Sequence, residues 1–85
     1  MNRLTIKKED GSYTVAGGDN KKAVERLGAF EDALWELTDE MARIPEELAQ
    51  LRNSGKEKTV RYREMVARKL ITNSIYVFFE EHKLL

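Results

Sequence analysis

Few residues in this sequence could perform acid, base or metal chemistry. There is one histidine, His82, and no cysteine, so a single chain can build neither a thiol–imidazole pair nor a multi-histidine metal site. Acidic residues form adjacent pairs at 39–40, 46–47 and 80–81, but neighbours on a helix point about 100° apart and do not converge. Glu36 and Glu40 share a face, for which a solvated surface is the simpler interpretation. We therefore expect no enzymatic activity and no catalytic, cofactor-binding or metal-binding residues.

Basic residues form the second kind of candidate site. The cluster consists of Lys58, Arg61, Arg63, Arg68 and Lys69. Lys58, Arg61 and Arg68 fall at helical spacing, as contacts to nucleic-acid phosphates or to an acidic protein would require. Residues 63–75 also weakly resemble a helix-turn-helix, although the glycine of the turn is missing. Solvated charge, an acidic protein partner and nucleic acid remain three open interpretations.

Length and composition indicate one small domain, residues 1–85, with 15 basic and 15 acidic side chains. The longest uncharged stretch, Leu70–Phe79, is half of the roughly 20 residues that a membrane span needs, and no apolar run follows the charged start. We therefore expect a soluble protein without membrane contact. Residues 23–50 are mainly acidic and residues 51–69 mainly basic, which predicts two elements that face each other, within one chain or between chains.

Residues 1–18 predict a β-hairpin. Alternating segments flank the pair Asp10-Gly11, which is the pattern of two strands joined by a tight turn. With a two-residue loop, Ile6 lies opposite Val15, and Leu4, Ile6, Tyr13 and Val15 share one apolar face. Because an isolated two-stranded ribbon is marginal in water, this face is expected to pack on the helices that follow.

Residues 19–53 predict an acidic helix with Asp19 or Asn20 as its N-cap. Its apolar residues recur at alternating steps of three and four, the heptad pattern of a helix seam. Pro45 interrupts the helix, and we expect a kink there rather than a break because the seam keeps its phase. The predicted core and self-association residues are this seam with the neighbouring tryptophan: Leu27, Phe30, Leu34, Trp35, Leu37, Met41, Ile44, Leu48 and Leu51.

Residues 56–82 predict a second helix that changes from basic to apolar along its length. Gly55 suits the left-handed position after the first helix, and Ser54 with Glu57 has capping-box spacing before the second. Ile75–Phe79 is rich in strand formers, so a short strand is the alternative there. As a helix this stretch is apolar on all sides, which indicates burial on two sides. Its Phe78 and Phe79, together with Phe30 and Trp35 of the first helix, form a wider apolar surface than a small monomer is expected to cover, so we expect a homodimer or larger assembly.

Two segments carry a family resemblance. Val24–Asp32 contains an Arg-Leu-x-x-Phe-Glu-Asp stretch, and Ile44–Leu48 contains Pro-Glu-Glu followed by a hydrophobic residue. With these motifs the chain resembles small uncharacterised prophage-encoded proteins of Firmicutes, and residues 55–80 resemble their C-terminal helix. The resemblance implies no catalytic residues. It implies a mobile-element protein in the cytoplasm of a bacterial host that acts by binding a host or phage macromolecule, as anti-CRISPR counter-defence inhibitors do.

The sequence thus predicts an α+β fold, in which an N-terminal β-hairpin is followed by a long antiparallel helical hairpin with a kink at Pro45. The predicted function is that of a non-catalytic, phage-derived protein-interaction module that self-associates and binds a macromolecular partner. We expect a homodimer, a protein partner and no cofactor. The alternative is a small nucleic-acid-binding regulator that uses the basic stripe of the last helix.

Overall fold

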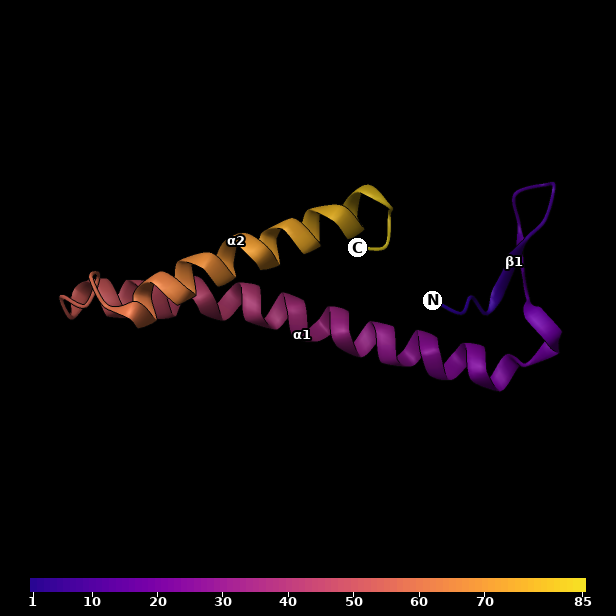
Figure 1. Ribbon diagram of the computed structural model, residues 1–85, viewed down its shortest axis with the longest axis horizontal. Helices are drawn as coiled ribbons and strands as arrows, with labels where there is room; N and C mark the ends of the chain where they lie inside the picture. Colours follow the sequence, from indigo (N-terminus) through magenta and orange to yellow (C-terminus); the bar gives the residue numbers. More distant parts are fainter. The chain divides into compact units, whose positions relative to one another are not determined.

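The predicted order of a β-hairpin and then a helical hairpin is confirmed in the computed structural model, which describes residues 1–85 (Figure 1). Its elements are β1 (Thr5–Lys7), β2 (Tyr13–Val15), the short 3-10 turn η1 (Ala16–Gly18), α1 (Asn20–Asn53) and α2 (Val60–Glu81). The chain forms two compact units, residues 1–33 and residues 34–85. The boundary falls inside α1, and each unit is described by itself. Neither helix has a stretch long and apolar enough to cross a membrane.

The β-hairpin has a different register from the predicted one. β1 and β2 are antiparallel with Thr5 opposite Val15, Ile6 opposite Thr14 and Lys7 opposite Tyr13. The loop therefore has three residues instead of two. Gly11 N donates to Lys8 O at 3.0 Å, and Lys8 N donates to Ser12 O at 2.8 Å. Gly11 has φ 87°, the left-handed position that a three-residue hairpin loop gives to glycine.

The register shift separates the apolar residues that were expected to share a face. Side chains alternate along a strand, so Tyr13 and Val15 now lie on one face and Ile6 on the other. Ile6 and Tyr13 are 53% and 56% exposed, so the prediction of a buried face containing both is wrong. The ring of Tyr13 instead lies beside two cations, with Arg3 Cζ at 5.8 Å and Lys7 Nζ at 5.9 Å from its centroid.

Helix α1 begins after Asp19, which is its N-cap and one of the two residues predicted for that position. Asp19 Oδ1 accepts a hydrogen bond from Lys22 N at 3.1 Å, which satisfies one of the amide groups left free in the first turn. The helix continues through Pro45 to Asn53. Proline has no amide hydrogen to donate to the preceding turn, yet the helix is not split. The bend expected at Pro45 stays a prediction.

The connection between the helices contains one confirmed and one wrong prediction. Gly55 has φ 70°, Gly55 N donates to Arg52 O at 3.0 Å and Lys56 N donates to Leu51 O at 2.8 Å, which is the Schellman arrangement. The cap of α2, however, is Thr59, whose Oγ1 accepts from the Tyr62 amide at 3.2 Å. Ser54 cannot serve α2 because its hydroxyl donates back to Gln50 O at 2.8 Å.

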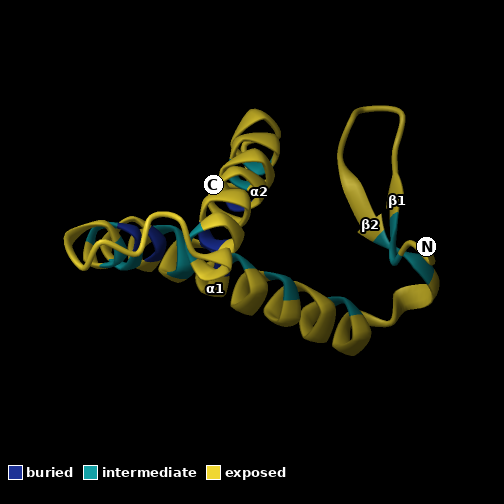
Figure 2. Cartoon of the chain, turned by 60° about the vertical axis from the view of Figure 1, so that its left-hand side comes forward, coloured by how far each residue is buried: buried dark blue, intermediate teal, exposed yellow.

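Helix α2 runs back from this connection beside the second half of α1, and the two helices diverge towards the C-terminal end of α2 (Figure 1). The core of this unit consists of Ile44, Leu48 and Met65, with Leu51 and Tyr62 packed against it. Figure 2 shows the buried residues where α1 and α2 adjoin. The stretch Ile75–Phe79 lies within α2, so the strand alternative is wrong.

Candidate interaction surface

The predicted seam on α1 is used in two different ways. Leu37, Ile44 and Leu48 are buried, and Leu34, Met41 and Leu51 are half-buried, all in the unit of residues 34–85. This part of the seam forms the intramolecular side of the helical hairpin. Leu27 and Phe30 belong to the other unit. Trp35 is 77% exposed, because its position on α1 lies far round the helix from Leu37.

In the unit of residues 1–33, Leu27 and Phe30 line an open hollow of about 400 Å³ between the N-terminal segment and α1. Met1, Leu4 and Ala23 contribute most of the remaining apolar lining. Arg26, also in the lining, donates through Nη1 to the backbone carbonyl of Asn2, so one guanidinium fastens the N-terminal segment to α1. The first part of the seam thus supports the β-hairpin unit.

Two ion pairs join the acidic helix to the basic one along one edge of the helical hairpin. Arg68 makes a bidentate pair with Glu40, with Nε to Oε1 at 2.5 Å and Nη2 to Oε2 at 2.9 Å. Arg61 Nη2 lies 3.4 Å from Glu47 Oε2. The predicted facing of acidic and basic elements is therefore confirmed within a single chain.

The Glu40–Arg68 pair has an electrostatic signature. The hydrogen bond from Arg68 holds the pKa of the Glu40 carboxyl below its usual range, and the same hydrogen bond raises the pKa of Arg68. The side chain of Arg68 is more than half exposed, so water and dissolved salt screen this pair. The pair links α1 to α2 through two hydrogen bonds.

The five predicted basic contacts do not form one surface. Arg61 and Arg68 are engaged by carboxylates of α1. Arg63 and Lys69 are exposed, but six helical positions separate them, which places them about 120° apart around α2. Lys58 precedes α2 in the connection. The continuous basic stripe expected from the spacing is therefore divided.

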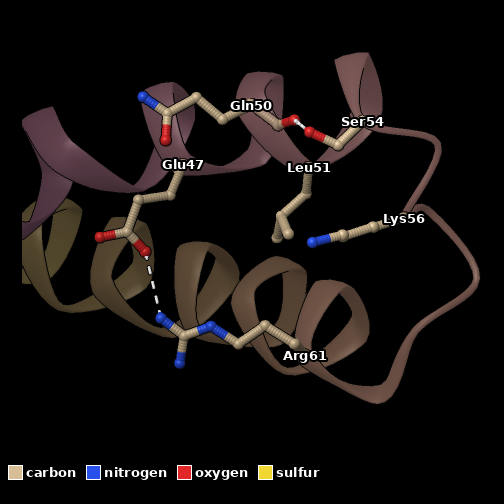
Figure 3. A pocket seen from close by; sticks show the side chains of 6 residues that line it. All are labelled: Glu47, Gln50, Leu51, Ser54, Lys56 and Arg61. Atoms are coloured by element: carbon tan, nitrogen blue, oxygen red, sulfur yellow. Dashed lines mark hydrogen bonds and ion pairs between the residues drawn. The ribbon is translucent and has the colours of Figure 1, made fainter.

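A polar hollow of about 400 Å³ lies at the closed end of the helical hairpin (Figure 3). Its lining residues are Glu47, Gln50, Leu51, Ser54, Lys56 and Arg61. Figure 3 shows Arg61 extending from α2 to the Glu47 carboxylate, and Lys56 beside Leu51. The carboxylate of Glu47 balances Arg61, so the hollow presents mainly the ammonium group of Lys56. Nothing in this arrangement resembles an acid–base pair or a metal cage, and no group of three or more acidic or histidine side chains converges in the structure.

His82 ends α2 as a structural residue. Its amide donates to Phe78 O, and its ring Nδ1 lies 2.8 Å from the same oxygen, so the nitrogen carries the hydrogen of that bond. The ring also packs on Phe78, with centroids 4.5 Å apart. His82 is thus part of the helix C-cap.

Most of the exposed large apolar side chains in residues 34–85 lie on α2, and we call a group of six of them the α2 apolar surface. Its members are Val66, Leu70, Ile71, Ile75, Val77 and Phe78, of which Leu70 is 65% exposed. Part of this surface lines an open hollow of about 430 Å³. The sequence indicated that the stretch Ile75–Phe79 is apolar on all sides, but it did not show which side of α2 is left uncovered by α1. The buried side is marked by Thr72, which is 1% exposed.

Comparison of the chain with protein-family models, with curated proteins and with solved structures finds no significant match. The functional assignment therefore rests on the residues and their arrangement.

Proposed function

We propose that this protein is a non-catalytic interaction module that self-associates and binds a macromolecular partner. The observation that carries the proposal is the α2 apolar surface. Six large apolar side chains on one helix are exposed, whereas the buried apolar core of the chain consists of Leu37, Ile44, Leu48 and Met65. Contiguous apolar surface of this kind marks interaction sites in small proteins, and short chains without disulfides often gain stability by association.

The partner bound by the assembled protein is proposed to be a protein. The ion pairs of Arg61 and Arg68 support this choice over nucleic acid, because each guanidinium already has a carboxylate partner. Phosphate binding there would have to displace Glu47 and Glu40. A counter-defence role in a bacterial host, implied by the resemblance to prophage proteins, would be one form of such binding.

Light scattering coupled to size exclusion, with absorbance recorded at two wavelengths, tests both self-association and the choice of a protein partner over nucleic acid. We expect the mass of a dimer or larger assembly and a protein-like ratio of absorbance at about 260 and 280 nm. A monomer across the accessible concentrations would contradict self-association. A raised signal at the shorter wavelength that salt removes, and that is lost in an Arg61→Ala/Arg68→Ala variant, would favour the nucleic-acid alternative.

A matched pair of variants locates the association surface. Leu70→Glu places a charge in the α2 apolar surface and is expected to shift the protein towards the monomer. Val24→Glu places the same charge at an exposed apolar side chain of the other unit, which is 68% exposed against 65% for Leu70. The expected result is that Val24→Glu keeps the assembled mass and that Leu70→Glu loses it. An assembled mass for both variants would remove Leu70 from the interface, and its loss in both would show that the effect is not specific to α2.

A further inference from the structure

One side of α2 carries opposite charges at its two ends, at equal distances from its middle. We call it the outer stripe, and its residues are Arg63, Val66, Leu70, Asn73, Val77 and Glu81. Their spacing of three or four positions places them on the same side of the helix. All six are exposed. The stripe thus has a positive end, an uncharged centre and a negative end.

The charges at the two ends are unfavourable for an isolated helix. A helix favours acidic side chains at its N-terminus and basic ones at its C-terminus, but the first turn of α2 has no acidic residue and its last turn has no basic one. The ion pairs of the hairpin involve Arg61 and Arg68 and do not include Arg63 or Glu81. Neither charged end of the outer stripe therefore forms an ion pair within the chain.

We propose that two copies of this chain pair through their outer stripes, with the two α2 helices antiparallel. This proposal rests on the proposed self-association and specifies its geometry. An antiparallel arrangement centred beside Thr72 places Arg63 of each copy next to Glu81 of the other, and Leu70 of each next to the Asn73–Ser74 region of the other. Such an interface is self-complementary, as the two-fold symmetry of a homodimer requires.

The charge pattern selects a second copy in this orientation over other arrangements. Parallel pairing would place Arg63 beside Arg63 and Glu81 beside Glu81, and like charges in contact are unfavourable. Within one chain the two residues lie about 27 Å apart along the helix axis, so they cannot pair with each other. Thr72 is 1% exposed and marks the covered side of α2, so the exposed outer stripe lies on another side of the helix at the proposed symmetry axis.

Charge reversal tests this geometry. Arg63→Glu and Glu81→Arg each turn two attractive contacts of the dimer into repulsive ones, so each is expected to weaken dimerisation by about tenfold at low salt. The double variant Arg63→Glu/Glu81→Arg restores both contacts with exchanged signs, and its dimer dissociation constant should return to within about threefold of the original. Dissociation constants from sedimentation equilibrium provide the measurement.

Two controls separate this effect from a loss of folding. Both single substitutions bring the ends of α2 into agreement with the helix dipole, so circular dichroism should show undiminished helix. Lys21→Glu makes the same change of net charge as Arg63→Glu at an exposed position of α1 and should leave the dissociation constant unchanged.

The outcomes distinguish the geometry from the proposed function. A dimer that the single reversals do not weaken, or that the double variant does not restore, would overturn antiparallel pairing while self-association stands. If the unmodified protein is a monomer at all concentrations, both proposals fail.

Discussion

At the level of single residues, Ile44 and Trp35 show that size does not determine contribution to stability. Ile44 is 3% exposed and belongs to the core, whereas Trp35 is 77% exposed. We expect Ile44→Val to lower the free energy of unfolding by about 0.5–1.5 kcal/mol, because it removes one buried methylene. Trp35→Ala should change it by less than about 0.5 kcal/mol. Urea unfolding followed by circular dichroism measures both.

A larger loss from Trp35→Ala than from Ile44→Val would mean that the tryptophan is covered in solution. Because unfolding and dissociation are linked in an oligomer, both variants are compared at one protein concentration.

The pair of Glu40 and Arg68 makes stability depend on pH. The pKa of Glu40 is lowered in the folded chain by its hydrogen bond with Arg68, so the folded state favours the ionised carboxylate. This contribution is fully present above the ordinary pKa of a glutamate and is lost as the pH falls through the lowered one. Thermal unfolding in acidic and neutral buffers should show that Glu40→Gln lowers Tm slightly at neutral pH and weakens its fall in acid.

The partner substitution checks the assignment of this effect. Arg68→Gln should remove the same part of the pH dependence, and the two substitutions together should do no more than either alone, because both break one interaction. Fully additive effects would show that Glu40 and Arg68 act separately.

At the level of elements, two glycines should respond to the same substitution with opposite signs. Gly55 has φ 70° in the connection between the helices, and Gly28 is helical within α1. A Cβ built at either position meets nothing within 4 Å. Gly55→Ala should therefore destabilise by about 1–2 kcal/mol through backbone strain alone. Gly28→Ala should stabilise the helix around it by about 1 kcal/mol.

Thermal unfolding reports Gly55→Ala, and amide hydrogen exchange reports Gly28→Ala in its own unit. A neutral Gly55→Ala would show that the connection adopts another conformation in solution.

The elements that could be predicted from the sequence are those with local causes. The left-handed conformation of Gly55 depends only on nearby residues, and its prediction is confirmed. The N-cap also has a local cause, and Asp19 is one of the two residues predicted for it. The hairpin register was missed by one residue because Asp10 Oδ1 accepts from both Ser12 N and Ser12 Oγ, which favours the longer loop. The hydrogen bonds from the Ser12 side chain and backbone also lower the pKa of Asp10. The sequence Asp10-Gly11-Ser12 was the feature from which the longer loop could have been predicted.

The candidate surface depends on tertiary packing, and for that reason it could be predicted only in part. The heptad pattern of α1 indicated its packing side, and the segment Leu37–Leu51 occupies it. The last half of α2 is apolar in every direction, so periodicity could not indicate which residues α1 would cover. The burial of Thr72 and the exposure of Leu70 follow from the turn at Gly55 and the positions of the two ion pairs.

At the level of the whole molecule, stability should depend on protein concentration. Association that covers the α2 apolar surface stabilises the folded chain by mass action, so Tm should rise as the protein is concentrated. For Leu70→Glu, which places a charge in that surface, Tm should be independent of concentration. Scanning calorimetry over a hundredfold range of concentration provides the measurement, and a constant Tm for the unmodified chain would contradict the proposed association.

The short connection between α1 and α2 also determines the order of events during folding. It brings residues that are close in sequence, such as Leu51 and Tyr62, to the same hydrophobic cluster. Chains dominated by such local contacts fold within about microseconds to milliseconds. Encounters between chains at about 1 µM proceed at roughly 0.1–10 per second. Each helical hairpin is therefore complete long before it meets another copy. If the chain self-associates as proposed, each new copy therefore exists first as a folded monomer whose α2 apolar surface is open to other partners.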